Sequence, residues 1–370
     1  MTVLGKSEKD KFAGCLLGGA VGDALGAPVE FMSGAEIVSN FGAAGVRDFL
    51  PAYGRRGAIT DDTQMTLFTA EGLIRGYVRL QDRGIGPAFI ATVGYAYSRW
   101  LSTQGLQPAA SVLERQDGWL IRNKALHHAR APGRTCVSAL QTKASWETMA
   151  ANDSKGCGGV MRVAPVGLLY KHFVVDEEKA LKEAFDLACD LAALTHGHPT
   201  GFLTAGVMAG IVLLLLKGAS IEEALTRIKP HLRKRPRHSE TMQAIERAKA
   251  FADDRTMMPA KAIQSLGGGW VADEALAIGL FCALRAENFE EGIVMAVSHG
   301  GDSDSTGSIA GNFLGASMGK TAIPKRWLDA LELRDVIEEI ATDMAELPEW
   351  DIGDRDSKDS ERIFAKYPPN

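Results

Sequence analysis

Residues 12–25 read Phe12-Ala13-Gly14-Cys15-Leu16-Leu17-Gly18-Gly19-Ala20-Val21-Gly22-Asp23-Ala24-Leu25, and glycines recur every four residues at positions 14, 18, 22 and 26. Glycine costs a helix about 1 kcal/mol relative to alanine, so a stripe of glycines indicates a helix face on which another backbone lies close. Glycines 307, 311, 315 and 319 repeat this spacing late in the chain. We expect the two helices to pack together, which would bring Asp23 and Glu30 close to Asp302 and Asp304.

The rest of the sequence also favours helices. No run of alternating β-branched residues is long enough to demand a sheet. Helical periodicity covers 179–194, and Ser220-Ile221-Glu222-Glu223 and Asn288-Phe289-Glu290-Glu291 are typical helix starts. We therefore predict an all-α fold, a compact orthogonal helical bundle in a single domain over 1–370, with its core at about 10–345 and a polar surface tail. The glycine-rich connection at 40–60 leaves room for a small hairpin.

Composition and charge exclude some classes of partner. Of the 370 residues, 46% are hydrophobic and 24% are charged, which is typical of a soluble globular protein. The formal net charge of −5 gives no electrostatic basis for binding nucleic acid or an anionic membrane. One basic run, at 227–237, contains two prolines, and we interpret it as a solvated loop between helices.

The cysteines and the apolar segments favour a cytoplasmic location. The five cysteines, at positions 15, 136, 157, 189 and 282, lack the paired spacing of a zinc site or a disulfide framework. Residues 1–11 lack the apolar core of a signal peptide. The longest apolar run, at 202–216, is shorter than the roughly 20 residues that span a bilayer, so we predict a buried helix there.

A cluster of oxygen donors stands just before the late glycine-spaced helix. The stretch Gly300-Gly301-Asp302-Ser303-Asp304-Ser305-Thr306-Gly307 contains two carboxylates and three hydroxyls in succession. Donor sets made only of oxygen suit Mg²⁺, Mn²⁺ or Ca²⁺ better than Zn²⁺, which prefers His or Cys. The alternative is a helix N-cap, because Asp and Ser are favoured capping residues, but one cap accounts for only one of these side chains.

A second acidic cluster repeats this chemistry nearly a whole chain away. Thr60-Asp61-Asp62 supplies one hydroxyl and two carboxylates at the start of a predicted helix. Four carboxylates held together without cations would repel one another and raise each other's pKa values, so clusters that converge are expected to bind two metal ions. If the clusters stay apart, each is a separate helix cap.

Five stretches of the sequence occur together, and in this order, in a known family. They are Gly22-Asp23-Ala24-Leu25-Gly26-Ala27-Pro28-Val29-Glu30-Phe31, Ile59-Thr60-Asp61-Asp62-Thr63-Gln64-Met65, Gly159-Val160-Met161-Arg162-Val163-Ala164-Pro165, Leu194-Thr195-His196 and Gly300-Gly301-Asp302-Ser303-Asp304-Ser305. Together they resemble the ADP-ribosylglycohydrolases, which include ADP-ribosylarginine hydrolases and the enzyme that reactivates dinitrogenase reductase. The resemblance implies an all-α enzyme that removes ADP-ribose from a modified side chain with two Mg²⁺ or Mn²⁺ ions. The metal ligands that it implies are Thr60, Asp61, Asp62, Asp302, Asp304 and the hydroxyl of Ser305.

The same resemblance suggests which residues act on the glycosidic bond. Cleavage of a ribosyl bond passes through an oxocarbenium-like state, and two cations could hold the ribose hydroxyls and activate a water. Glu30 matches a glutamate that lies close to the metals in relatives, and it is our candidate for the general acid or base. Asp117 stands about where some relatives carry a catalytic aspartate, although its surroundings match poorly and also fit a turn.

Substrate contacts are predicted in two further stretches. The loop at 152–159 contains Ser154, Gly156, Cys157, Gly158 and Gly159, and we expect its backbone N–H groups to face the pyrophosphate. Many relatives have asparagine at the position of Cys157, which we interpret here as a small neutral wall and not as a nucleophile. The resemblance makes His196 a contact on the substrate side. Candidates for a wall against adenine are Tyr95, Tyr97, Trp100, Trp119 and Trp270.

Three functions can be weighed against this sequence. The leading hypothesis is a metal-dependent hydrolase of the N- or O-glycosidic bond in an ADP-ribosylated protein or an ADP-ribose-containing small molecule. The second is an immunity or binding protein that blocks an ADP-ribosyltransferase by occlusion, with docking surfaces in 104–135 and 226–260. The third is a hydrolase that has lost its activity, which disagrees with the complete ligand set.

Overall fold

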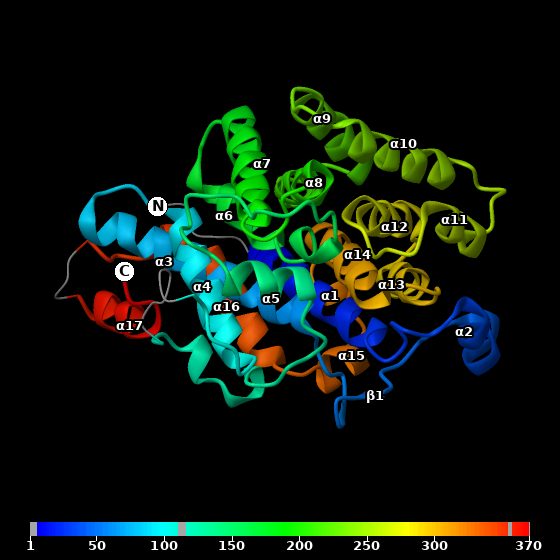
Figure 1. Cartoon of the computed structure of the whole chain (residues 1–370), viewed down its shortest axis with the longest axis horizontal. Coiled ribbons are helices and arrows are strands. Elements are labelled where there is room, and N and C mark those ends of the chain that lie inside the picture. Colours follow the sequence, from blue (N-terminus) through cyan, green and yellow to red (C-terminus); the bar gives the residue numbers. More distant parts are fainter. Residues whose placement is uncertain (1–5, 110–115, 354–356, 370) are drawn as a thin grey trace.

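The computed structural model describes residues 6–109, 116–353 and 357–369, and these residues are mostly helical, which confirms the all-α prediction (Figure 1). The helices of the first half are α1 Lys6–Gly26, α2 Gly34–Phe41, α3 Asp61–Arg83, α4 Phe89–Thr103, α5 Arg134–Gln141, α6 Ala164–Phe173 and α7 Glu177–Ala193. Those of the second half are α8 Pro199–Leu216, α9 Ile221–Arg233, α10 Ser239–Asp253, α11 Pro259–Leu266, α12 Ala272–Arg285, α13 Phe289–Val297, α14 Ser303–Met318, α15 Lys325–Ala330, α16 Arg334–Glu346 and α17 Lys358–Lys366.

One small antiparallel hairpin is found among the described residues, within the glycine-rich connection. Its strands are β1 Pro51–Ala52 and β2 Arg55–Arg56, and Pro51 pairs with Arg56. The two turn residues, Tyr53 and Gly54, both have positive φ (49° and 81°), which is the backbone that a two-residue hairpin requires. Short 3₁₀ turns complete the connections, at Gly42–Ala44, Leu120–Arg122, Lys124–Leu126, Cys157–Gly159, Lys320–Ala322 and Leu347–Glu349.

The two glycine-spaced helices, α1 and α14, run antiparallel at the centre of the molecule (Figure 1). Their glycines face one another in three pairs, Gly14 with Gly315, Gly18 with Gly311 and Gly22 with Gly307, and Gly26 faces Ser303. A Cβ on Gly18 would lie 2.4 Å from the carbonyl oxygen of Gly311, closer than real Cβ contacts. The predicted packing is therefore confirmed, and it brings the end of α1 to the start of α14.

The other helices surround this central pair. Helix α14 also packs against α12 and α13, and α1 packs against α16. Helix α8 packs against α6, α7 and α9, while α3 packs against α4. Helices α2 and α17 lie at opposite ends of the long axis (Figure 1). The start of α3 thereby lies near the junction of α1 and α14, which it contacts directly.

Helix α8 is the predicted buried apolar helix. It is the one described helix that is long and apolar enough to cross a bilayer, and 89% of that span is buried inside the protein. Its Gly206 faces Cys189 and Phe185 of α7, where a Cβ would lie within 3 Å of their side chains. The burial of α8 makes it a core helix of this fold.

Two predictions about the surface are wrong. The basic run at 227–237 is not a loop throughout, because α9 extends to Arg233 with Pro230 inside it, and Arg227 pairs with Glu177 and Glu178 of α7. The C-terminal tail is not wholly on the surface either. Ile363 and Tyr367 are buried, since one side of α17 packs on the core.

Candidate active site

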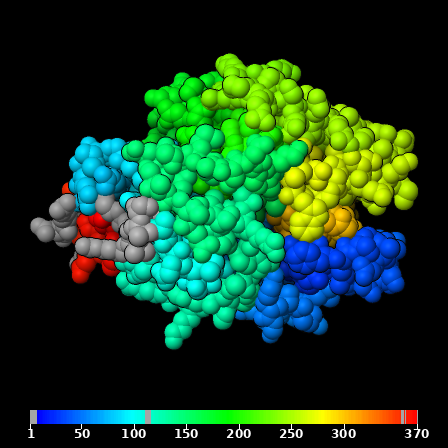
Figure 2. Space-filling model, in the orientation of Figure 1, coloured from blue at the N-terminus to red at the C-terminus, as the bar shows by residue number. Residues whose placement is uncertain are grey.

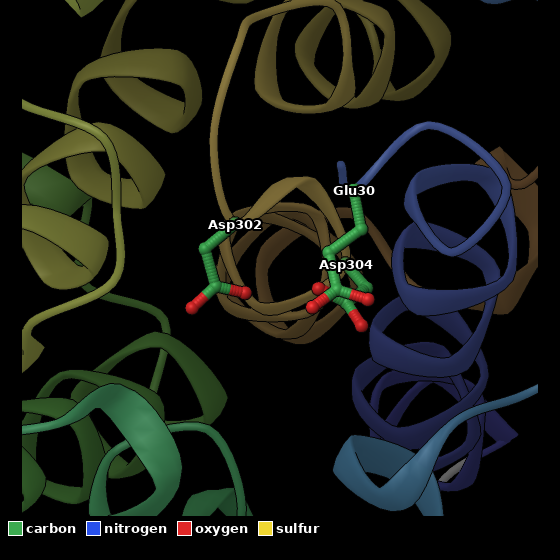
Figure 3. A group of neighbouring side chains, drawn as sticks. All are labelled: Glu30, Asp302 and Asp304. Atoms are coloured by element: carbon green, nitrogen blue, oxygen red, sulfur yellow. The ribbon is translucent and has the colours of Figure 1, made fainter. Parts of the chain in front are cut away.

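Three carboxylates meet where α1 ends and α14 begins (Figure 3). Glu30 lies in the turn after α1, and Asp302 and Asp304 lie at the start of α14. One oxygen from each of the three carboxylates lies within 4.8 Å of the others. Asp302 occupies the N-cap position of α14, but its side chain makes no capping hydrogen bond. The simple capping interpretation therefore does not hold for Asp302, whose Oδ2 instead accepts a hydrogen bond from the Cys157 thiol at 2.8 Å.

Asp61 and Asp62 reach the same region from the start of α3. The hydroxyl of Thr60 caps the helix by accepting a hydrogen bond from Asp62 N at 3.3 Å. Asp23, which is fully buried, accepts hydrogen bonds from Thr60 N at 3.0 Å and from Thr63 N at 3.2 Å. The Thr63 hydroxyl donates to the same carboxylate. Asp23 of α1 therefore holds the first turn of α3 in place and orients both acidic side chains.

A loop from the middle of the chain supports Asp61 from the other side. The Asp61 carboxylate accepts a hydrogen bond from Gly133 N at 3.1 Å, and its own N–H donates to Arg130 O at 3.0 Å. The Arg130 guanidinium in turn forms an ion pair of 3.2 Å with the buried Glu332. Glu332 also accepts from Ile59 N at 3.1 Å, so one buried network fixes the chain on both sides of Asp61.

Burial and mutual repulsion raise the pKa values of these carboxyl groups. Burial, followed by the negative charges of Asp304 and Asp61, raises the pKa of Glu30 to about 9. Burial and the charge of Asp304 raise the pKa of Asp23 to about 7. The pKa values of Asp61, Asp62 and Asp302 all rise well above the ordinary value, mainly because of burial. So many charges in one buried place are stable only with protons or with cations.

The donor set fits hard divalent cations. Glu30 Oε2 and Asp62 Oδ1 are buried and have no hydrogen-bond partner, although buried polar atoms are almost always paired. Both belong to residues that line the same pocket as Asp61, Asp302 and Asp304. Unpartnered carboxylate oxygens beside three further carboxylates are the ligands that Mg²⁺ and Mn²⁺ prefer.

These carboxylates line a pocket of about 210 Å³. On the surface, the blue N-terminal, green middle and yellow later segments meet around a recess (Figure 2). Of the predicted site residues, the pocket is lined by Glu30, Asp61, Asp62, Asp302, Asp304, Ser305, Gly156, Cys157, Gly158 and His196. Four predicted residues do not line it: Thr60, Ser154, Gly159 and Asp117. The places of the first three are explained by the helix cap at Thr60, by a hydrogen bond between the hydroxyls of Ser154 and Thr135, and by a close approach of Gly159 to Gly201.

Two N–H groups of the glycine loop already have partners within the protein. Gly156 N donates to the hydroxyl of Ser154 at 3.3 Å, and Cys157 N donates to Trp270 O at 3.3 Å. The backbone of the loop is therefore bonded to its own neighbours and to the segment before α12.

One cation at the pocket was not predicted from the sequence. Arg134, at the start of α5, lines the pocket and is exposed, and it forms no ion pair with another described residue.

His196 takes part in a chain of buried hydrogen bonds. The Arg162 guanidinium donates to the Thr195 hydroxyl at 2.7 Å, and that hydroxyl lies 2.8 Å from His196 Nδ1. Burial and the charge of Arg162 lower the pKa of His196 to about 3, so the ring is neutral. The Thr195 hydroxyl also lies 3.3 Å from Ala192 O, so its one proton can point to that carbonyl or to Nδ1. Nε2 lies beside Gly156 and Gly158 at the pocket wall.

Trp270 is the only one of the five predicted aromatic candidates that lines this pocket. It is 46% exposed and stacks on Phe31, with ring centroids 5.8 Å apart, and Phe31 is 78% exposed. Since Phe31 directly follows Glu30, this stack joins the Glu30 segment to the loop before α12. The other candidates are accounted for elsewhere: Tyr97 and Trp100 in the core, Tyr95 against Trp146, and Trp119 against Tyr367.

Asp117 does not reach the pocket. Its carboxylate accepts a hydrogen bond of 2.9 Å from Arg75, which lies 14 residues after Asp61 on the same helix. At 1.5 Å per residue, that is about 21 Å along α3. The predicted catalytic position of Asp117 is therefore not supported, and the alternative of a loop residue beside Gly118, whose φ is 94°, fits the structure.

Known proteins share sequence similarity with nearly the whole chain. The sequence model of one family, described as ADP-ribosylglycohydrolase, matches residues 5–352. An ADP-ribosyl-[dinitrogen reductase] glycohydrolase of Rhodospirillum rubrum is 26% identical over 337 residues, which cover 89% of this chain and 93% of that protein. An ADP-ribosylarginine hydrolase of Serratia proteamaculans is 25% identical over 338 residues, which cover 90% of this chain and 78% of the relative.

A solved structure has a similar fold. It is described as an ADP-ribosylglycohydrolase-related protein complex, and it superposes with a TM-score of 0.61 at 26% sequence identity. The match covers 92% of this chain and 99% of that chain. The helical architecture around α1 and α14 is thus shared over nearly the whole length of both proteins.

Proposed function

This chain belongs to the ADP-ribosylglycohydrolase family, and we propose that it releases ADP-ribose from a modified side chain at a centre of two divalent cations, Mg²⁺ or Mn²⁺. The enzyme class follows from the family, whose members hydrolyse glycosidic bonds of ADP-ribose. The single observation that carries the metal centre is the pair of buried, unpartnered oxygens, Glu30 Oε2 and Asp62 Oδ1, in a pocket with three more carboxylates.

The residues that would hold the cations come from two helix starts. They are Asp61 and Asp62 of α3, Asp302, Asp304 and Ser305 of α14, and Thr60. Burial raises the pKa of Asp304, and a hydrogen bond with Thr60 is among the contacts that partly oppose this rise. When bound, such cations polarise substrate oxygens and lower the pKa of a water. With cations held by these carboxylates, the hydroxyls next to the anomeric carbon would bind at the ions, so the carboxylates would set the place of the ribose.

Glu30 is proposed to move the proton in the reaction. Hydrolysis breaks the bond from the anomeric carbon to the departing nitrogen or oxygen, forms a bond to the oxygen of water, and transfers one proton from water to the leaving group. Glu30 is 8% exposed, it faces the acidic cluster, and one of its oxygens is unpartnered. A carboxyl group in this setting can take the proton from water or give one to the leaving group.

Three other pocket residues are proposed to bind the ADP part. Arg134 offers a guanidinium with no ion-pair partner among the described residues, which suits a pyrophosphate. His196 offers a neutral imidazole with Nε2 at the pocket wall, because its pKa of about 3 keeps the ring uncharged. Trp270 offers an exposed ring face for stacking. These contacts orient the substrate, while the carboxylates act on the ribose.

The substrate class is proposed to be an ADP-ribosylated protein. The relative from R. rubrum is named for a modified enzyme, dinitrogen reductase, and the relative from S. proteamaculans is named for modified arginine. A small ADP-ribose-containing molecule would fit the same chemistry, so both belong in the substrate panel. Direct blocking of an ADP-ribosyltransferase is a separate activity, and the same panel can detect it.

The test is release of ADP-ribose from a panel of modified substrates, with Mg²⁺, with Mn²⁺ and with a chelator. We expect turnover with either ion, loss of turnover with the chelator, and recovery when the ion is restored. Calorimetry should detect Mg²⁺ binding by the wild type, and much weaker binding by Asp302→Ala. Equal Mg²⁺ binding by the two proteins would contradict the metal centre. Full protection against a transferase without any release of ADP-ribose would instead favour a blocking protein.

A further inference from the structure

One arginine inside the protein carries a charge that no carboxylate pairs with. Arg162 is fully buried and forms no ion pair with another described residue. The two other fully buried arginines both have such a partner, since Arg75 pairs with Asp117 and Arg99 pairs with Glu71. Buried charges are almost always paired, because it is costly to take an unpaired charge out of water. An unpaired guanidinium in the interior therefore calls for a physical reason.

The groups that touch Arg162 are all neutral. Its Nη2 donates to the Thr195 hydroxyl at 2.7 Å and to Leu191 O at 3.2 Å, and its Nη1 lies 3.3 Å from the sulfur of Cys136. Burial raises the pKa of the Cys136 thiol, so this sulfur carries no charge. The guanidinium also lies over the ring of Tyr97 at 4.5 Å, and its Nε has no hydrogen-bond partner. The positive charge is thus held in place without being cancelled.

Arg162 stands one side chain behind the wall of the pocket. Cys136, Gly158 and His196 all line the pocket. They form one continuous piece of wall, because a Cβ on Gly158 would lie 2.8 Å from the Cys136 sulfur and 3.1 Å from His196 Cε1. Arg162 contacts Cys136 directly, and it reaches His196 through the Thr195 hydroxyl, which lies 2.8 Å from Nδ1.

The charge of Arg162 acts at this wall. Burial, followed by the charge of Arg162, lowers the pKa of His196 to about 3, so the imidazole adds no charge of its own. Charges in the protein interior act over about 10 Å and are screened little by salt. The pocket therefore has two electrostatic parts, the carboxylates at the helix starts and a wall with a fixed positive charge behind it.

We propose that Arg162 is a specificity-determining residue of this pocket: its buried charge stands behind the wall of Cys136 and His196 and attracts the pyrophosphate of ADP-ribose without touching it. The inference rests on the proposed function, since it assigns a source of affinity for the ADP part of the proposed substrate. Arg134, by contrast, is exposed at the pocket, so salt screens its charge. A positive charge also opposes the binding of cations, so Arg162 is expected to strengthen ADP-ribose binding and to weaken Mg²⁺ binding.

The test compares two neutral variants with one that keeps the charge. Arg162→Gln retains an N–H donor for Thr195, Arg162→Met fills the space with an apolar chain, and Arg162→Lys remains positive. Since Arg162 has no carboxylate partner among the described residues, the neutral variants leave no opposite charge unpaired and are expected to fold. Calorimetry on the full-length protein should show that ADP-ribose affinity at saturating Mg²⁺ falls about 10-fold in both neutral variants. Mg²⁺ affinity without ADP-ribose should rise in the same variants, and Arg162→Lys should keep most of the affinity for ADP-ribose.

The matched comparison is Arg134→Gln, which removes the exposed charge. At about 1 M salt the Debye length is only about 3 Å, so the loss of ADP-ribose affinity in Arg134→Gln should shrink, whereas the loss in Arg162→Gln should persist. A purely structural role of Arg162 would weaken the binding of ADP-ribose and of Mg²⁺ together, and that result would overturn the inference. Unchanged ADP-ribose affinity in the neutral variants would overturn this inference alone, whereas a wild type that binds no ADP-ribose would also overturn the proposed function.

Discussion

Gly22 of α1 and Gly307 of α14 lie against each other, backbone to backbone. A Cβ added to Gly22 would stand 2.0 Å from the carbonyl oxygen of Gly307, and a Cβ added to Gly307 would stand 2.5 Å from that of Gly22. Asp23 directly follows Gly22, and Asp304 lies one helical turn before Gly307. The contact that joins the two helices therefore also sets the spacing of the acidic residues.

Gly22→Ala should destabilise the fold, because the two backbones would have to separate. Overpacking a dense core typically costs 1–3 kcal/mol, and here the obstacle is backbone, so we expect a loss of about 3 kcal/mol or more. The measurement is the free energy of unfolding in urea. Gly86→Ala is the control, since a Cβ there would meet nothing within 4 Å. Equal stability of the two variants would contradict the role of the glycine contact.

The sequence predicts this part of the molecule well because the signal is local and repeated. A glycine at every fourth residue has one common physical reason, which is close packing of two helices. Both helices have this spacing. The stripes fix which helix ends meet, so the neighbourhood of Glu30, Asp302 and Asp304 follows from the pattern. Thr60 as the helix cap follows equally from local chemistry.

Other parts of the site depend on contacts that no local pattern reveals. Asp23 accepts a hydrogen bond from Thr60 N, 37 residues further along the chain. Asp61 accepts one from Gly133 N, 72 residues further along, and this bond positions the residue before Arg134. The glycine loop at 152–159 was predicted to turn its N–H groups to the pyrophosphate, but the N–H of Gly156 donates to the hydroxyl of Ser154. The position of Asp117 was inferred from its place in the chain order. In the structure Asp117 pairs with Arg75, which lies far along α3 from Asp61 and from the site.

Asp23→Ala should weaken metal binding, although Asp23 does not line the pocket. The mutation leaves the N–H groups of Thr60 and Thr63 without their buried acceptor, so the first turn of α3 loses its anchor. We expect about 1–3 kcal/mol less stability and a 10–100-fold lower Mg²⁺ affinity, as for other residues that orient metal ligands. Calorimetry on the folded variant provides the measurement.

Asp23→Asn gives the control for this positioning role. It keeps one carbonyl oxygen as an acceptor while removing the charge, so it should recover part of the Mg²⁺ affinity lost in Asp23→Ala. A purely structural role would lower stability in both variants and leave Mg²⁺ affinity unchanged. That result would remove Asp23 from the account of the metal centre.

The metal-free protein should lose stability as the pH rises from 7 to 9. A carboxyl group ordinarily has a pKa near 4, but burial and neighbouring charge raise the pKa of Glu30 to about 9. The folded state therefore binds more protons than the unfolded state in this window, so its stability falls as those protons leave. Thermal unfolding with a chelator should show a lower Tm at pH 9 than at pH 7.

Saturating Mg²⁺ should reduce this pH dependence, because the ions bind the charged carboxylates of the folded state. Histidines do not contribute much here, since an unfolded histidine is largely neutral at pH 7 and burial lowers the pKa of His196 to about 3. A chelated protein whose Tm is constant or rises over this range would show that the acidic cluster is not under the predicted electrostatic strain.

Glu30→Gln should lower turnover more than it lowers Mg²⁺ affinity. Glutamine keeps the shape of the side chain but cannot exchange a proton, so we expect kcat to fall by about 10²–10⁴-fold with saturating Mg²⁺. Glu36→Gln is the matched control, because Glu36 belongs to the exposed capping box of α2 on the same segment. Unchanged kcat in Glu30→Gln would remove Glu30 from the mechanism.

The double variant Asp61→Asn plus Asp304→Asn should fold but release no ADP-ribose. Removing two of the mutually repelling charges relieves strain in the acidic cluster, which offsets the weaker hydrogen bond from Gly133 N to residue 61. Both residues lie among the proposed ligands of the cations, so the ribose hydroxyls lose their anchor. We expect a loss of activity beyond the 10²–10⁴-fold of a single acid–base group.

The control for the double variant is Asp117→Asn, whose carboxylate pairs with Arg75 outside the pocket. ADP-ribose release is measured on the folded fraction of both proteins, with circular dichroism as the check on folding. Asp117→Asn should keep its turnover, although loss of charge next to the buried Arg75 lowers its stability. If Asp117→Asn lost turnover while folded and the double variant kept it, the reacting centre would lie at Asp117 and not between α1, α3 and α14.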